Sequence, residues 1–106
     1  MKRIMLREVA FSRAGDKSNT STLSLIPYDE NNYEKLKQVV TSEKVKDYFQ
    51  GICLGTVTRY EIDGIKSLLF ILEEALDGGN TRSLRVDGYG KSLCAYFMSM
   101  MIDWPE

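Results

Sequence analysis

The feature that most constrains the fold is a polar stretch, residues 12–20 (SRAGDKSNT), between two apolar runs. The runs contribute Leu6, Val9, Ala10 and Phe11 before the stretch, and Leu23, Leu25 and Ile26 after it. Apolar alternation on both sides of a turn-forming segment is typical of a β-hairpin. We therefore expect strands at residues 3–12 and 20–26, joined by a connection longer than a two-residue turn. Turn geometry asks only for Gly, Asn or Asp, so Arg13 and Lys17 need another explanation.

Size and charge exclude several classes of protein. A chain of 106 residues fits a single domain over residues 1–106. The net charge of -1 argues against nucleic-acid binding, which depends on a basic surface. No apolar run approaches the roughly 20 residues of a membrane span, and the N-terminal apolar run is too short for a signal peptide. We therefore expect a cytoplasmic protein with neither a nucleic-acid nor a membrane partner.

The chain contains no histidine, which limits its chemistry. Nucleophiles activated by histidine are excluded within the chain, and the commonest metal ligand is missing. Cys53 and Cys94 are far apart and have no metal-binding spacing, so we expect small buried side chains and no disulfide in a reducing compartment. The sequence indicates neither a metal nor a cofactor.

The remaining pattern predicts helices and strands in alternation. Asp29 and Ser42 are expected to cap two helices, which are followed by a strand at 54–62. An apolar helix is expected to start at Asp63 or Ser67 and to continue to residue 76. A strand at 81–87 and a last helix from Leu93 to Met101 complete the prediction. Lysines on the first two helices are expected to form a solvated face. The broad apolar stripe at 65–76 needs cover on two sides, in part from another subunit. The resulting order, ββααβαβα, predicts an α+β layered sandwich with a mostly antiparallel sheet.

Two polar loops with glycines carry the candidate site. Their charged side chains, glycine amides and polar groups suit an anion such as a carboxylate or phosphate: Arg13, Gly15, Asp16, Lys17, Asn19 and Thr20 in the first loop, and Gly78, Gly79, Thr81 and Arg82 in the second. Asp16 and Lys17 are also candidates for an acid–base pair, although such neighbours are typical of a turn. The alternative is that Asp16 pairs internally with Arg13 or Arg82 and the loops are rigid corners.

The same loops carry a resemblance to a known family. Residues 13–20 and 78–87 resemble the A-R-S-G-D-K-G-[DN]-T and G-G-x-T-R-S-L-R-x-D motifs of the acyclic terpene utilisation (AtuA-like) family, and similarity continues through 45–49, 57–61 and 90–93. Phe11 stands where many members have His, and Ser18 where they have Gly. The first difference removes the one imidazole that the motif would supply.

The resemblance implies a ferredoxin-like α+β domain without a cluster, occurring as a stand-alone protein. It also implies a link to breakdown of acyclic terpenoids through acyl-CoA intermediates. Our leading hypothesis is an accessory module that self-associates, pairs with a large AtuA-family subunit, and holds an anionic group. The alternative is an enzyme or half-site for an acyl, acyl-CoA or carboxylate substrate, in which Arg13, Lys17 and Arg82 bind the anion and Asp16 is the base. A third possibility is a structural oligomer whose loops pair their charges internally.

Overall fold

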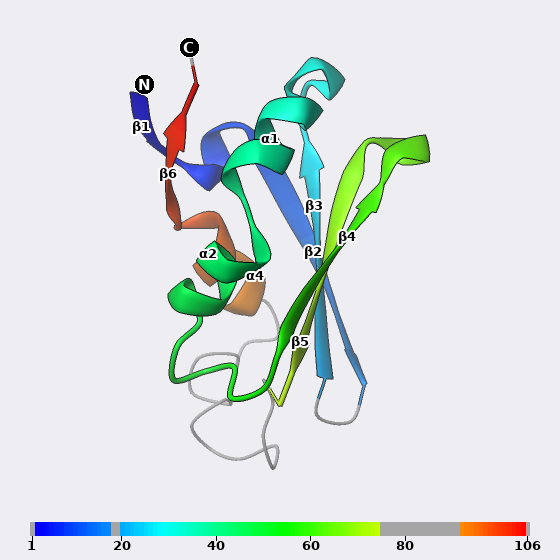
Figure 1. Ribbon diagram of the computed structural model, residues 1–106, viewed down its shortest axis with the longest axis vertical. Coiled ribbons are helices and arrows are strands. Elements are labelled where there is room, and N and C mark those ends of the chain that lie inside the picture. Colours follow the sequence, from blue (N-terminus) through cyan, green and yellow to red (C-terminus); the bar gives the residue numbers. More distant parts are fainter. Residues whose placement is uncertain (1, 18–19, 75–91, 106) are drawn as a thin grey trace.

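A computed structural model describes residues 2–17, 20–74 and 92–105 (Figure 1). Its strands are β1 (Lys2–Met5), β2 (Ala10–Lys17), β3 (Thr20–Pro27), β4 (Val57–Ile62), β5 (Ser67–Glu73) and β6 (Met101–Trp104). Its helices are α1 (Tyr33–Val39), α2 (Ser42–Tyr48) and α4 (Ser92–Met98), with short 3-10 turns at Leu6–Glu8, Glu30–Asn32 and Asp63–Ile65. None of the helices in these ranges is long and apolar enough to cross a membrane.

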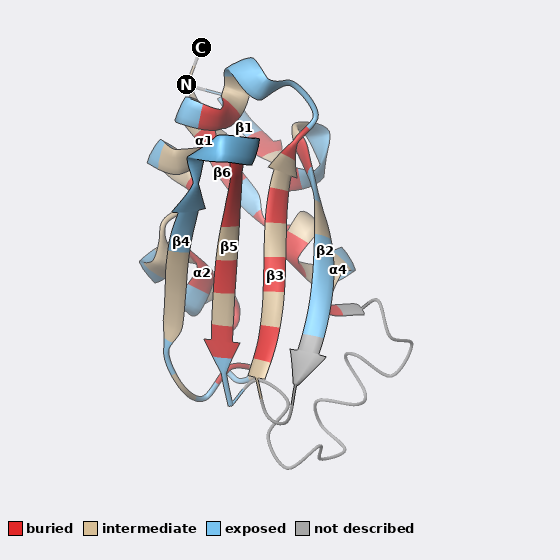
Figure 2. Ribbon diagram, turned by 90° about the vertical axis from the view of Figure 1, so that its right-hand side faces the viewer, coloured by how far each residue is buried: buried red, intermediate tan, exposed pale blue. Residues whose placement is uncertain are grey.

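A four-stranded antiparallel sheet forms the centre of the molecule, in the order β2-β3-β5-β4. The helices lie on one side of this sheet, and no element in the described ranges covers the other side (Figures 1 and 2). Alternate residues of β3 and β5 point into the layer between sheet and helices, where Leu23, Leu25, Leu68, Phe70 and Leu72 are buried. The core is completed from the helical layer by Tyr33, Leu36, Val45, Phe49 and Phe97.

The strand β5 corrects the prediction of an apolar helix over residues 65–76. Ser67–Glu73 pairs with β3 on one side and β4 on the other, with Leu69 opposite both Ser24 and Tyr60. An unbroken apolar run satisfies the helical and the strand pattern at once. Two strand neighbours satisfy its backbone groups, so this segment is a central strand.

The first predicted strand is also divided. A 3-10 turn at Leu6–Glu8 separates β1 from β2, and the backbone N–H of Leu6 donates to the carbonyl of Met100 over 2.8 Å. β1 then pairs with β6 in a separate two-stranded sheet. The prediction of a helix reaching Met101 is therefore wrong, because α4 ends at Met98 and Met101–Trp104 forms β6.

The hairpin prediction is correct, but its connection is shorter than expected. The ladder between β2 and β3 continues to the pair Lys17 and Thr20, so most of the polar stretch belongs to the strands. Pro27 is the last residue of β3, one residue beyond the predicted strand at 20–26. Asp29 caps the turn that leads into α1, and Thr41, one residue before the expected Ser42, caps α2 by accepting from the N–H of Lys44 over 3.1 Å.

The α+β class, with antiparallel sheets and helices packed against them, is confirmed. The predicted order of elements is wrong where β5 replaces a helix and where β6 ends the chain. The strand expected at 81–87 lies outside the described residues.

Candidate functional site

The open side of the four-stranded sheet is the candidate functional surface, and Figure 2 shows it facing the viewer. We call it the outer face. Its residues alternate along each strand with those that face the helical layer, and the ladder register aligns them across the sheet. They are Phe11, Arg13, Gly15, Thr20, Thr22, Ser24, Ile26, Thr58, Tyr60, Ile62, Leu69, Ile71 and Glu73.

Large apolar side chains on the outer face remain accessible. Tyr60 is 50% exposed, Ile62 38% and Phe11 37%. Phe11 also packs against the exposed ring of Tyr28, with ring centroids 5.4 Å apart. A sheet face with solvent on it usually carries polar residues, and a contiguous apolar surface marks an interaction site.

Three predicted site residues of the first polar loop, Arg13, Gly15 and Thr20, are on this surface. Arg13 is exposed, and its guanidinium makes no ion pair with any side chain that the structure describes, which excludes those of Asp16 and Lys17 from the comparison. Gly15 pairs with Thr22, whose hydroxyl donates to the carbonyl of Gly15 over 3.1 Å. A Cβ at position 15 would lie 2.9 Å from that hydroxyl oxygen, so glycine permits this close approach.

The other predicted site residues are only partly placed. Asp16 and Lys17 are paired in the ladder with Ser21 and Thr20. The rest lie outside the described residues: Asn19, Gly78, Gly79, Thr81 and Arg82. The convergence of the two loops therefore stays a prediction.

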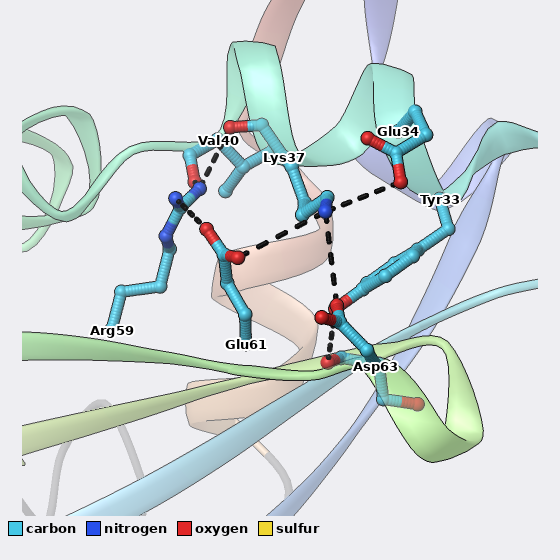
Figure 3. A network of polar contacts seen from close by, with 8 residues as sticks. Tyr33, Glu34, Lys37, Val40, Arg59, Glu61 and Asp63 are labelled. Carbon is cyan, nitrogen blue, oxygen red and sulfur yellow. Dashed lines mark hydrogen bonds and ion pairs between the residues drawn. The ribbon is translucent and has the colours of Figure 1, made fainter.

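A second cluster, which we call the polar network, joins α1 to β4 and the turn after it (Figure 3). The Tyr33 hydroxyl donates to Oδ1 of Asp63 over 2.8 Å and also lies 3.2 Å from the carbonyl oxygen of Ser67. Nζ of Lys37 lies 3.2 Å from Glu34, 3.7 Å from Asp63 and 3.9 Å from Glu61. Lys37 is thus held by three carboxylates, contrary to the solvated face expected for the helix lysines.

Arg59 completes the polar network from β4. Its Nη1 donates to the carbonyls of Lys37 and Val40 over 2.7 and 3.1 Å, and its Nη2 donates to Glu61 over 2.8 Å. The last carbonyls of a helix have no partner within it, so Arg59 satisfies two of them at the end of α1. This cation also complements the negative end of the helix dipole.

The pKa shifts follow from these contacts. Burial, followed by the hydrogen bond to Asp63, raises the pKa of Tyr33 to about 12. The same bond lowers the pKa of Asp63, and the bond to Glu34 raises the pKa of Lys37. Each shift favours the protonation state that holds the network together at neutral pH. Because the charges pair with one another, we interpret the network as a structural link between α1 and the sheet.

The described structure gives a role to Cys53 only. No disulfide joins Cys53 to Cys94. Cys53 is buried, its sulfur lies 3.2 Å from the carbonyl of Glu73, and burial raises its pKa. A raised pKa disfavours the reactive thiolate. The described residues hold no group of three or more Cys, Asp or Glu side chains that could bind a metal.

An open groove of about 380 Å³ lies between α2 and the region before β6. Its lining includes Lys44 and Asp47 of opposite charge, and the cation Arg3 pairs with Asp103 over 3.0 Å. This balance of charge favours no particular class of ligand, so the outer face remains the stronger candidate.

Sequence reasoning missed most of the outer face. The β5 residues Leu69 and Ile71 were assigned to a helix, which hid their alignment with Tyr60 and Thr58. The strand period of the segment 57–62 was the available signal, because it places Thr58, Tyr60 and Ile62 on one face.

Comparison with known proteins agrees with the resemblance in the two loops. The AtuA ferredoxin-like domain matches residues 4–103. Comparisons with curated proteins and with solved structures give no significant match. Since the family match covers nearly the whole chain, the protein belongs to the AtuA ferredoxin-like domain family.

Proposed function

We propose that this chain is a small cytoplasmic accessory module that works by binding other protein subunits through its outer face. The observation that carries this proposal is the uncovered apolar surface formed by Phe11, Tyr60, Ile62 and the partly exposed Leu69 and Ile71. Covering such a surface removes apolar area from water, which contributes about 25 cal/mol per Å² before the costs of association.

The chemistry of the described residues supports assembly over catalysis. The polar network uses Lys37, Arg59 and Asp63 to fix α1 against the sheet. The Cys53 thiol is buried and has a raised pKa. A catalytic group needs access to a substrate and a pKa suited to its task, and neither cluster offers both.

Family membership supports the biological setting of the proposal. We infer that the module takes part in acyclic terpenoid or acyl-CoA catabolism as a partner of a large AtuA-family subunit. This inference depends on the family match over residues 4–103 and on the motifs at 13–20 and 78–87.

A specific observation favours a second role, the holding of an anionic group. Arg13 presents a guanidinium that pairs with none of the carboxylates whose side chains are described, two positions before Gly15 on the same strand face. Arginine binds carboxylates and phosphates through two parallel hydrogen bonds. An acyl carboxylate or the phosphates of an acyl-CoA would suit it, with residues 78–82 as the predicted second half of the site.

The proposal is tested by co-expressing the tagged chain with the large family subunit of its host and purifying through the tag. We expect the wild-type chain to retain the large subunit, and Leu69→Lys to lose it because it places a charge in the centre of the outer face. The matched control is Gln50→Lys, at an exposed position on the helical side. The proposal would be overturned if Leu69→Lys retained the large subunit as well as Gln50→Lys does. It would also be overturned if the wild type and both variants all failed to retain it.

A further inference from the structure

We propose that a second copy of this chain covers the outer face, forming a symmetric dimer with the two sheets face to face and a two-fold axis parallel to the strands. This inference rests on the proposed function, because it names one partner of that surface. The second copy and the large subunit use the same face, so binding of one excludes the other.

The ladder arranges the outer face in rows across the four strands. One row contains Arg13, Ser24, Leu69 and Tyr60, and the next contains Gly15, Thr22, Ile71 and Thr58. The row on the other side of the first one contains Phe11 paired with Ile26, and Ile62 lies at the same end of the sheet. Thr20 and Glu73 are paired after the second row. The outer face is therefore apolar at one end of the strands and polar at the other.

This gradient selects one of two possible dimers. A two-fold axis across the strands would place the apolar end of each sheet on the polar end of the other, burying Glu73 against apolar side chains. It would also stack β2 on β2 and bring the two Arg13 side chains close together, which is unfavourable for like charges. An axis parallel to the strands keeps apolar rows on apolar rows, and aligned sheets are a preferred packing geometry.

The selected axis reverses the strand order, so β2 lies on β4 of the second copy and β3 lies on β5. Phe11 then faces Ile62 of the second copy, and Arg13 faces its Tyr60. Because the interface is isologous, both contacts occur twice. Ser24 and Thr22 face Leu69 and Ile71 of the second copy near the axis.

The contact between Arg13 and Tyr60 gives both side chains a partner. Among the described side chains of the outer face, Arg13 carries the only positive charge and Glu73 the only negative charge. The ring of Tyr60 is half exposed, and a guanidinium over a tyrosine ring is attracted to its face. The arrangement leaves the two arginines on opposite edges of the dimer.

Charge substitutions at Tyr60, measured by sedimentation equilibrium on the full chain, test this geometry. We expect a monomer–dimer equilibrium for the wild type, and a dissociation constant raised roughly tenfold or more by Tyr60→Lys, which sets a cation against Arg13. Tyr60→Glu, which sets a carboxylate there, should bind at least tenfold tighter than Tyr60→Lys. Adding Arg13→Glu to Tyr60→Lys should restore association.

Gln50→Lys and Gln50→Glu are the controls, since they add the same charges on the helical side, and circular dichroism checks that each variant is folded. Equal effects of Tyr60→Lys and Tyr60→Glu, failure of the double variant, or a wild-type monomer at all concentrations would overturn the inference. A monomeric chain that still binds the large subunit in a Leu69-dependent manner would overturn the dimer alone. Loss of both interactions would overturn the proposed function as well.

Discussion

The Tyr33 hydroxyl donates a hydrogen bond of 2.8 Å to the carboxylate of Asp63, linking the start of α1 to the turn between β4 and β5. Tyr33 is 2% exposed, and Nζ of Lys37 lies 4.9 Å from the centre of its ring. One side chain thus belongs both to the core and to the polar network. The network holds the helical layer on the side of the sheet opposite the outer face.

Removing this hydroxyl should weaken the fold. We expect Tyr33→Phe to lower the free energy of unfolding by about 1 kcal/mol, the typical contribution of one hydrogen bond, as measured by urea denaturation. Tyr28→Phe is the control, because Tyr28 is 66% exposed and its ring still packs on Phe11. Equal stability losses in the two variants would show that the bond to Asp63 contributes nothing.

The raised pKa of Tyr33 predicts a loss of stability in alkali. Between the ordinary value of 10.0 and about 12, the unfolded chain loses the phenolic proton while the folded chain keeps it. The free energy of unfolding should therefore fall as the pH rises through this window. The difference in stability between the wild type and Tyr33→Phe, followed from pH 9 to 12, should shrink in the same interval; a constant difference would contradict the assignment.

Asp63 predicts the opposite behaviour in acid. Its folded pKa is lowered, first by the hydrogen bond from Tyr33 and also by Lys37. The stabilisation is therefore present above the unfolded pKa and is lost as the pH falls through the folded one. We expect the free energy of unfolding to fall less steeply below about pH 4 in Asp63→Asn than in the wild type. Asp29→Asn, at the cap of the turn before α1, serves as the comparison. Identical acid profiles for the wild type and Asp63→Asn would exclude this role.

Arg59 should stabilise the end of α1. Arg59→Met removes the donors to the carbonyls of Lys37 and Val40 while keeping most of the apolar stem. We expect a loss of about 1–3 kcal/mol in urea denaturation, because the groups left behind are partly buried. Arg7→Met, at an exposed position, should change stability by less than about 0.5 kcal/mol. Similar values for both would contradict the capping role.

The two glycines near β4 make a matched pair for a steric prediction. A Cβ on Gly55 would lie 2.7 Å from the backbone carbonyl oxygen of Glu73, whereas nothing lies within 4 Å of one on Gly64. Gly55→Ala should therefore cost about 1–3 kcal/mol, and Gly64→Ala should be neutral or slightly stabilising. Thermal unfolding measures both, and a tolerated Gly55→Ala would show that the backbone there can move apart.

Local pattern was sufficient where neighbouring residues decide the structure. Alternation at Thr22, Leu23, Ser24 and Leu25 predicted β3, and the carboxylate of Asp29 predicted the start of the helical region. The run from Leu68 to Leu72 contains no polar residue, so its sequence does not distinguish the helical period of 3.6 from the strand period of two. Its state depends on pairing with β3 and β4, which no local pattern contains.

The candidate site was predictable to a similar extent. Arg13 stood out because a turn does not require an arginine, and Gly15 because glycine amides suit an anion site. Both residues are on the outer face. The polar network was not predictable, since Tyr33 and Asp63 are 30 residues apart and meet only once the helix packs on the sheet. The apolar residues of the outer face were hidden by the incorrect helix at 65–76.

The central claim is that protein covers the outer face in the working assembly, and hydroxyl-radical footprinting read by mass spectrometry tests it most directly. The experiment compares the chain in its purified assembly with the same chain diluted to monomer. Tyr60 and Leu54 are matched reporters, 50% and 55% exposed, on the outer face and on the loop before β4. We predict that assembly slows the oxidation of Tyr60 several-fold and leaves that of Leu54 unchanged. Equal oxidation of Tyr60 in both samples would contradict the claim.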